Sequence, residues 1–237
     1  MTVGDAQRVP ERMDVMVGDL RFALRVWRAV DEGSTAVVLL HATGKTARDW
    51  DVIASGLHAE RTVYAVDLRG HGASAWPGGY HMDLISQDVI GILDQMDLGP
   101  VDLVGHSLGG LVACRVAAAR QGQVRKLVLE DIGFPHPRPP GLPDRPAGEL
   151  PFDWHMVEQI RPQIDDPDPG WADIIGRITA PTLLIAGGAT SPVPQRHIVE
   201  LAYRLTDARM TTITAGHLVH ETMPAEYLRT LVAFLAE

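Results

Sequence analysis

The architecture of this chain follows from ten consecutive residues, 101–110, which read Val-Asp-Leu-Val-Gly-His-Ser-Leu-Gly-Gly. The apolar run at 101–104 predicts a buried strand, and the small residues at 111–120 predict a helix. A serine in the tight turn between such a strand and such a helix exposes its hydroxyl group, because the glycines beside it are too small to cover it. Ser107 is therefore the predicted nucleophile.

The two flanking glycines have a mechanical task in this turn. A Cβ atom at Gly105 or Gly109 would obstruct the close approach of strand and helix that holds the serine in place. The same turn puts the backbone N–H of Leu108 at a helix N-terminus, where unpaired donors and the helix dipole favour a negative oxygen. We therefore expect this N–H to form half of an oxyanion hole.

The rest of the chain alternates between strand patterns and helical patterns. Two alternating runs, 13–17 and 21–27, flank a Gly-Asp turn at 18–19 and predict an antiparallel hairpin. Continuous apolar runs follow at 36–40, 62–66, 101–104, 124–129, 182–186 and 210–213. This alternation predicts an α/β fold with a mostly parallel, eight-stranded sheet and helices on both faces. Ligands bind at the carboxyl ends of such strands, so the chemistry should lie just after each apolar run.

Length and composition set limits on the class of protein. The chain has 237 residues, of which 46% are hydrophobic, which predicts one domain over 1–237 with a modest insertion at 132–180. The insertion is expected because ten prolines lie between 135 and 169 and exclude long regular elements. A net charge of −9 disfavours nucleic acid and anionic membranes as partners and favours a small, largely apolar substrate.

The single cysteine, Cys114, excludes an intrachain disulfide and a cysteine-based metal cluster. Its place in the predicted helix after the serine indicates a small core residue, and a reducing cytoplasmic location fits this usage. No segment approaches the roughly twenty apolar residues that span a bilayer. No grouping of His, Asp and Glu has convincing metal spacing, so neither a metal nor a cofactor is expected, and the oligomeric state is not predicted.

Four motifs lie directly after predicted strands: His-Ala-Thr-Gly at 41–44, Asp-Leu-Arg-Gly-His-Gly-Ala-Ser at 67–74, Gly-His-Ser-Leu-Gly-Gly at 105–110 and Gly-His-Leu-Val-His at 216–220. In this order and spacing, they resemble the α/β-hydrolase superfamily over nearly the whole chain. The resemblance implies the fold predicted above and a serine, acid and histidine in that order along the chain.

The resemblance also implies which histidine is the general base. The catalytic histidine of the superfamily directly follows the glycine, which is His217 here, and its imidazole would take the proton of the serine. His220 competes for this role, but a position at the start of the last helix or a supporting role in the loop suits it better.

The acid departs from the commonest pattern of the superfamily. The loop after the seventh strand usually supplies an aspartate, whereas this chain has Thr190 and Ser191 there. Some members carry the acid after the sixth strand, where this chain has Glu130 and Asp131. The resemblance favours Asp131, and Glu130 stays open because one more residue of strand would exchange their directions. A Ser–His dyad without an acid is the third possibility.

The second oxyanion donor and the substrate contacts come from the remaining motifs. The resemblance assigns the second donor to the backbone N–H of Thr43, although Ala42 replaces the glycine that is usual before it, and an alanine would be strained there if the position needs a positive φ. The candidates for substrate binding are His41, His106, Phe152 and Trp154. The resemblance also implies that the insertion at 132–180 forms a short cap over the site. Each candidate has a structural alternative: fixing a loop, bracing the serine turn or anchoring this cap.

A serine nucleophile implies hydrolysis through an acyl-serine intermediate. Carboxylic esters, lactones and thioesters are the expected bonds, and the same triad also suits carbon–carbon bond hydrolysis or perhydrolysis. The alternative function is a ligand-binding receptor or scaffold that keeps the hydrolase fold.

Overall fold

The computed structural model describes residues 9–29 and 34–237, and residues 1–8 and 30–33 lie outside the described part. Its strands are β1 Glu11–Val17, β2 Leu20–Trp27, β3 Val37–Leu40, β4 Val63–Val66, β5 Val101–His106, β6 Val124–Glu130, β7 Thr182–Ala186 and β8 Ala208–Thr212. Its helices are α1 Asp51–Leu57, α2 Met82–Gln95, α3 Leu108–Ala119, α4 Trp154–Asp165, α5 Trp171–Gly176, α6 Gln195–Arg204, α7 Val219–Thr222 and α8 Pro224–Ala236, with a 3₁₀ turn at Ala47–Trp50.

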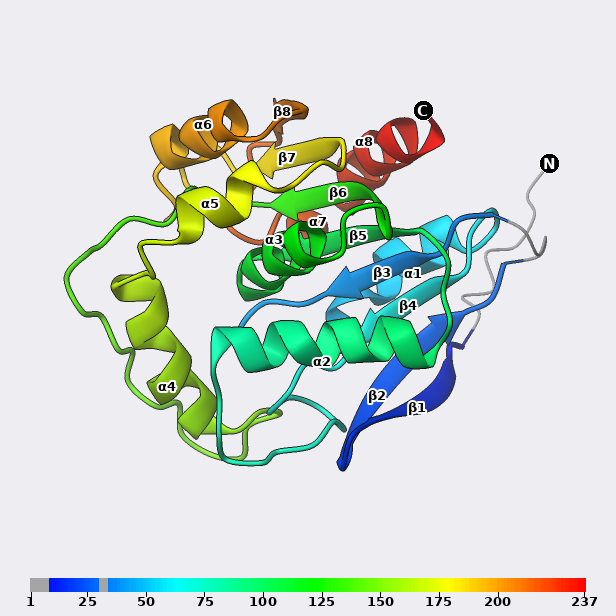
Figure 1. The fold of residues 1–237 in the computed structure, drawn as a ribbon, viewed down its shortest axis with the longest axis horizontal. Coiled ribbons are helices and arrows are strands. Elements are labelled where there is room, and N and C mark those ends of the chain that lie inside the picture. The colour runs from blue at the N-terminus through cyan, green and yellow to red at the C-terminus, as the bar shows by residue number, and fades with distance from the viewer. Residues whose placement is uncertain (1–8, 30–33) are drawn as a thin grey trace.

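Within the described residues these strands form one eight-stranded sheet in the order β1-β2-β4-β3-β5-β6-β7-β8 (Figure 1). The pairs β1–β2 and β2–β4 are antiparallel, and every later pair is parallel. The predicted hairpin and all six predicted later strands are present, and the last strand lies at 208–212 instead of 210–213. The predicted fold class is therefore confirmed.

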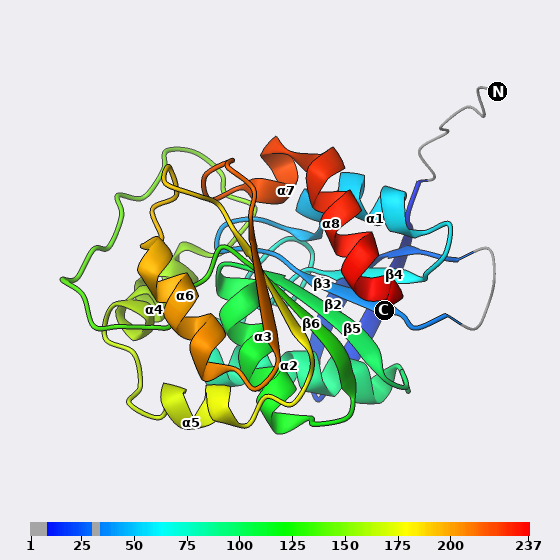
Figure 2. The same ribbon diagram turned by 90° about the horizontal axis from the view of Figure 1, so that it is seen from above.

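Helices cover both faces of the sheet, with α1 and α8 on one side and α2, α3 and α6 on the other (Figure 2). Successive residues of a strand point to opposite faces, and the core reflects this. Leu103 of β5 belongs to the cluster under α2 and α3, whereas Val104 belongs to the cluster under α1 and α8. The central strands are apolar throughout because both of their faces are buried.

The proline-rich segment 132–180 extends beyond the carboxyl ends of the parallel strands through α4 and, after α5, returns to the start of β7 (Figure 1). Its first part, 133–150, forms no helix or strand, and α4 and α5 follow it. Helix α4 begins where the Asp153 side chain accepts a hydrogen bond from the His155 N–H, a standard N-cap. Pro162 lies inside α4 near its end, where the lost hydrogen bond affects only the last turn.

The turn from β5 to α3 has the geometry that the glycines predicted. Ser107 has φ 51° and ψ −116°, which non-glycine residues rarely adopt. A Cβ atom at Gly105 would lie 2.4 Å from the Gly109 carbonyl oxygen, and one at Gly109 would lie 2.2 Å from the Leu40 carbonyl oxygen. Both glycines are therefore required by close backbone contacts.

Two further expectations concern the core and the membrane. Cys114 is fully buried on α3, where burial raises the pKa of its thiol to about 12, so it behaves as a small apolar side chain. Over the described ranges, no helix combines the length and apolar composition that crossing a bilayer requires.

The glycine contacts generate a stability prediction. We expect Gly109→Ala to lower the free energy of unfolding by about 1–3 kcal/mol, since the new methyl group meets backbone and not a movable side chain. Urea denaturation followed by circular dichroism measures this change. Gly99→Ala is the control, because its Cβ would meet nothing within 4 Å and should leave the midpoint unchanged. Equal stability of the two variants would contradict the tight-turn argument.

Candidate active site

The described structure has a cavity of about 640 Å³ at the carboxyl ends of the strands. Ser107, Leu108, Thr43, Asp131 and His217 all line it, so five of the predicted site residues meet at one place although they lie far apart in the sequence. They come from the loops after β3, β5, β6 and β8. The remaining lining is mostly apolar and is supplied by α3, by the segment 132–164 and by the loop before α6.

His217 and Asp131 form a direct pair in this cavity. The Nδ1 atom of His217 lies 2.7 Å from Oδ2 of Asp131, whose side chain is fully buried. With Nδ1 directed at the carboxylate, Nε2 is the ring nitrogen that remains for a substrate or for Ser107. No hydrogen bond joins the Ser107 hydroxyl to this ring among the described residues, and such contacts often tighten only when a substrate binds.

The loop after β7, where the superfamily usually carries its acid, instead holds Asp131 in place. The hydroxyl group of Ser191 donates a hydrogen bond to Oδ2 of Asp131, and the Gly187 N–H donates one to Oδ1 over 2.8 Å. A Cβ atom at Gly187 would lie 1.9 Å from the Gly216 carbonyl oxygen, so only glycine allows this approach. Sequence reasoning treated Ser191 as a failed acid and missed this supporting contact.

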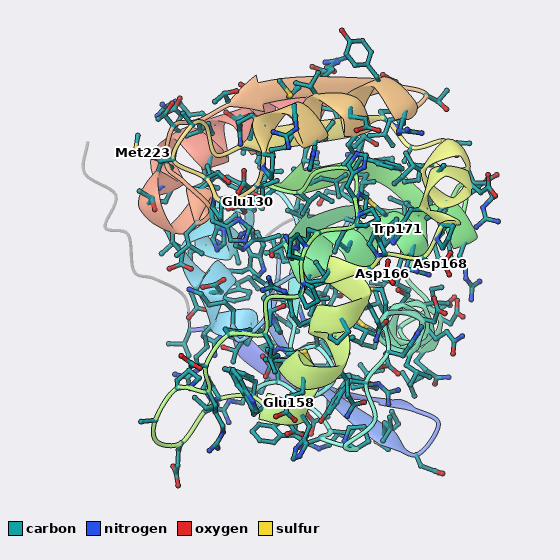
Figure 3. The ribbon with its side chains drawn as sticks, turned by 90° about the vertical axis from the view of Figure 1, so that its left-hand side faces the viewer. Glu130, Glu158, Asp166, Asp168, Trp171 and Met223 are labelled. Atoms are coloured by element: carbon teal, nitrogen blue, oxygen red, sulfur yellow. The ribbon has the colours of Figure 1, made fainter. Side chains whose placement is uncertain are left out.

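The backbone conformation directs the side chains of Glu130 and Asp131 away from each other. Asp131 has φ 46°, in the left-handed region, while its N–H still donates to the Ile185 carbonyl of β7 over 2.8 Å. This turn sends the two consecutive carboxylates to different partners. Figure 3, which views the carboxyl ends of the strands, shows Glu130 on the side of the C-terminal helices and Trp171 on the side of α5.

Glu130 belongs to a second acid–histidine group that contains His220 and Asp49. The Nδ1 atom of His220 lies 2.7 Å from Oε2 of Glu130, and the backbone N–H of His220 donates to Oε1 over 3.0 Å. On the other side of the ring, Nε2 lies 3.4 Å from Oδ2 of Asp49. Trp50 stacks on the ring with centroids 4.0 Å apart. His220 thus lies at the start of helix α7, and Glu130, Asp49 and Trp50 hold its ring, as expected for a supporting residue.

The charges in this group favour a protonated His220. Burial alone would lower its pKa, but the Glu130 and Asp49 carboxylates outweigh burial and raise the pKa to about 9. Burial would likewise raise the pKa of Glu130, yet the charge of His220 and the hydrogen bonds from its ring and backbone N–H hold it below its usual value. At neutral pH, His220 is therefore an imidazolium between two carboxylates.

His106 connects this group to the loop that carries His217. Its Nε2–H donates to the backbone carbonyl of His217 over 2.8 Å, and burial lowers its pKa, so the ring is neutral. Potential ligand atoms of Asp49, His106 and His220 lie within 4.8 Å of one another, which is the spacing of a possible metal site. A protonated His220 has no lone pair on Nε2, so its ion pair with Asp49 accounts for this arrangement.

The two predicted oxyanion donors both face the cavity. Leu108 is the first residue of α3, and the first N–H groups of a helix have no partner within it. Thr43 lies across the cavity in the loop after β3. Ala42 does not have a positive φ; Gly44 has φ 77°, so the loop uses glycine two residues later and Ala42 is not strained there.

The four predicted substrate contacts lie outside the cavity lining, so a role of these residues in substrate binding stays a prediction. His41 is fully buried and accepts a hydrogen bond from the Leu68 N–H over 3.0 Å, while His106 contacts the His217 loop instead. Phe152 packs beside His71, and Trp154 packs against the core at the start of α4. These contacts fit the structural alternatives of the four residues, and the segment 132–180 lines the cavity with other residues.

The family model for the alpha/beta hydrolase fold matches residues 35–173, and the chain therefore belongs to the α/β-hydrolase fold family. Among similar proteins, the sn-1-specific diacylglycerol lipase ABHD11 of Mus musculus is 26% identical over 92% of this chain and 87% of its own length. Lipase LipV of Mycobacterium tuberculosis is 40% identical over 108 residues, which are 46% of this chain and 41% of that protein.

Solved structures with the same fold include an enol-lactonase from Burkholderia xenovorans. It aligns with a TM-score of 0.82 at 21% identity and covers 95% of this chain and all of that chain. A hydrolase from Pseudomonas aeruginosa aligns equally well, with a TM-score of 0.82 at 22% identity over 96% of this chain and 99% of that one. At these identities the likeness concerns the fold.

The His220 group generates a pH prediction. The pKa of His220 rises from 6.5 in the unfolded chain to about 9 in the folded one. The stabilisation that protonated His220 contributes to the fold is therefore complete below pH 6.5 and is lost as the pH rises through 9. We expect wild type to be more stable than His220→Gln at pH 6.5, and this difference to shrink by on the order of 1–3 kcal/mol by pH 10.

Urea titrations at several pH values measure that difference. Gly99→Ala is the control, because it changes no ionisable group and its Cβ would meet nothing within 4 Å, so its difference from wild type should stay constant with pH. A His220→Gln difference that does not depend on pH would show that the ring is neutral in the folded protein.

Proposed function

We propose that this protein is a serine hydrolase that cleaves a small, largely apolar ester through an acyl-serine intermediate. Ser107 is the nucleophile, His217 the general base and acid, Asp131 the acid that orients His217, and the Leu108 and Thr43 N–H groups the oxyanion donors. Membership of the hydrolase fold family and relatives named as lipases and esterases support cleavage of an ester bond.

The observation that carries this assignment is the 2.7 Å pair of His217 and Asp131 in the same cavity as Ser107. The carboxylate fixes the tautomer with the proton on Nδ1, which leaves Nε2 as the acceptor for the serine proton. When the ring becomes positive during attack, the buried carboxylate stabilises it. Glu130 binds His220 instead, which supports Asp131 as the acid of the triad.

The reaction has two halves. The Ser107 oxygen attacks the ester carbonyl carbon while Nε2 of His217 takes the hydroxyl proton, and the carbonyl oxygen becomes an oxyanion at the N–H groups of Leu108 and Thr43. The intermediate collapses, the carbon–oxygen bond to the alcohol breaks, and His217 returns the proton to the leaving alcohol. Water then attacks the acyl-serine with the same proton transfers and releases the acid.

The same steps apply to a lactone or a thioester, because only the leaving group differs. A small-molecule substrate fits a cavity of about 640 Å³. We also propose a cytoplasmic location, which rests on the single buried cysteine.

A covalent-labelling experiment tests the nucleophile. A fluorophosphonate should add once to wild type at Ser107 and abolish the hydrolysis of 4-nitrophenyl butyrate, whereas Ser107→Ala should neither react nor hydrolyse the ester. Intact-protein mass spectrometry and nitrophenolate absorbance measure the two effects. Ser55→Ala on α1, outside the cavity lining, should behave like wild type. Undiminished turnover by Ser107→Ala would refute the mechanism.

A comparison of the two neighbouring acids tests the triad. We expect Asp131→Asn to lower kcat about a thousandfold or more, since the amide favours the wrong tautomer of His217. Glu130→Gln should keep kcat within about tenfold of wild type and should cost about 3 kcal/mol of stability, because it breaks the buried pair with His220. Steady-state kinetics and urea denaturation measure these effects. The reverse order of kcat values would make Glu130 the acid.

A further inference from the structure

The cavity lining is positively charged outside the catalytic pair, whereas the chain as a whole is negatively charged. The chain carries a net charge of −9, yet three arginines, Arg138, Arg161 and Arg196, line the cavity. Asp131 is the carboxylate residue in the lining, and it is already paired with His217. A bound substrate therefore meets more positive than negative charge outside the catalytic pair.

Two of these arginines are held by one buried carboxylate. Asp165, at the end of α4, has a side chain that is 5% exposed. The Nε atom of Arg138 donates to its Oδ1 over 2.6 Å, and the Nε atom of Arg161 donates to its two oxygens over 2.8 and 2.9 Å. The Gly141 N–H also donates to Asp165, over 2.8 Å, which fixes the proline-rich segment to the same carboxylate.

This arrangement leaves donors available. Both arginines use Nε for Asp165, and their terminal Nη groups make no hydrogen bond within the described residues. One carboxylate balances only one of two guanidinium groups. Arg196, at the start of α6, forms neither an ion pair nor a side-chain hydrogen bond in the described part of the chain. Guanidinium groups with free N–H donors are suited to bind a carboxylate or a phosphate, and Asp165 holds two of the three in place.

Apolar side chains lie in the same cavity, among them Leu111, Val157, Ile160 and Trp171. A substrate that fills the cavity thus has an apolar stretch in contact with these residues, a scissile carbonyl at Ser107 and a third part in contact with the arginines. An anionic third part gains charged hydrogen bonds with the arginines, whereas a neutral one does not.

We propose that this cavity selects esters that carry an anionic group, such as a carboxylate, several bonds from the scissile carbonyl, and that Arg138, Arg161 and Arg196 bind this group. The proposal rests on the ester hydrolysis proposed above and specifies its substrate class as an amphiphilic monoanion. It refines the sequence-based expectation of a largely apolar substrate, since the apolar part remains and an anionic end is added.

Two matched ester pairs test the substrate class, each consisting of an acid and its methyl ester. In the first pair, 4-nitrophenyl hydrogen adipate and methyl 4-nitrophenyl adipate, the carboxylate is on the acyl side. In the second, 4-acetoxybenzoate and methyl 4-acetoxybenzoate, it is on the alcohol side. We expect wild type to favour the acid by about tenfold in kcat/KM in at least one pair, and increasing salt to reduce this preference.

Single substitutions assign the preference to the arginines. Arg138→Gln and Arg196→Gln should each reduce severalfold the ratio of kcat/KM for the acid to kcat/KM for its neutral ester. Neither should unfold the protein, because Asp165 keeps Arg161 in the first variant and Arg196 has no ion pair to lose. The control is Arg209→Gln, which removes an exposed arginine on β8 that is paired with Glu237 outside the cavity.

The outcomes separate this inference from the proposed function. Ser107-dependent turnover of the neutral esters with no preference for either acid overturns the anion site and leaves ester hydrolysis intact. If no ester is cleaved, ester hydrolysis fails, and the anion site is judged by binding to wild type, measured as the rise in Tm with monomethyl adipate against dimethyl adipate. A larger rise with the monoanion that Arg196→Gln removes supports the site, and equal rises overturn it.

Discussion

The strained backbone of Ser107 is the constraint on which the rest of the site depends. Its positive φ turns the chain from the centre of the sheet directly into α3, which exposes the hydroxyl group and frees the first N–H groups of the helix. Backbone contacts hold this conformation: the Ser107 N–H donates to the Glu130 carbonyl, and the Ser107 carbonyl accepts from two residues of α3. Gly105 and Gly109 make the approach possible, and the packed strands on either side prevent the turn from relaxing.

A second strained residue, Asp131, divides two consecutive acids between two histidines that are three residues apart. Asp131 binds His217 at the cavity, and Glu130 binds His220 among the buried aromatic residues beneath α8. His106 joins the two groups by donating to the backbone of His217. The loop that carries His217 is therefore held from two sides, by the carboxylate at the ring and by the buried ion pair three residues later, which restricts the movement of the ring relative to Ser107.

The sequence predicted the fold because its signals were local and consistent: continuous apolar runs for buried strands, and glycines where only glycine fits. It could not separate Glu130 from Asp131, since that choice depends on one positive φ at the strand end, which no pattern of residue types reveals. The substrate contacts were hard to predict for a different reason. Which residues of the segment 132–180 meet the cavity is set by long-range packing, so the sequence could not show that Phe152 and Trp154 lie outside its lining, and the pairing of Arg138 with Asp165 was invisible in a proline-rich stretch.

The irregular path of residues 133–150 has an evolutionary consequence. Because this stretch forms no helix or strand, a change in its length or composition would disturb few backbone hydrogen bonds and would leave the sheet beneath it untouched (Figure 1). Selection could thus alter which molecules enter while the reaction itself stays constant. A lineage could acquire new substrates here at little risk to folding, whereas equivalent changes around residue 107 would eliminate both structure and catalysis.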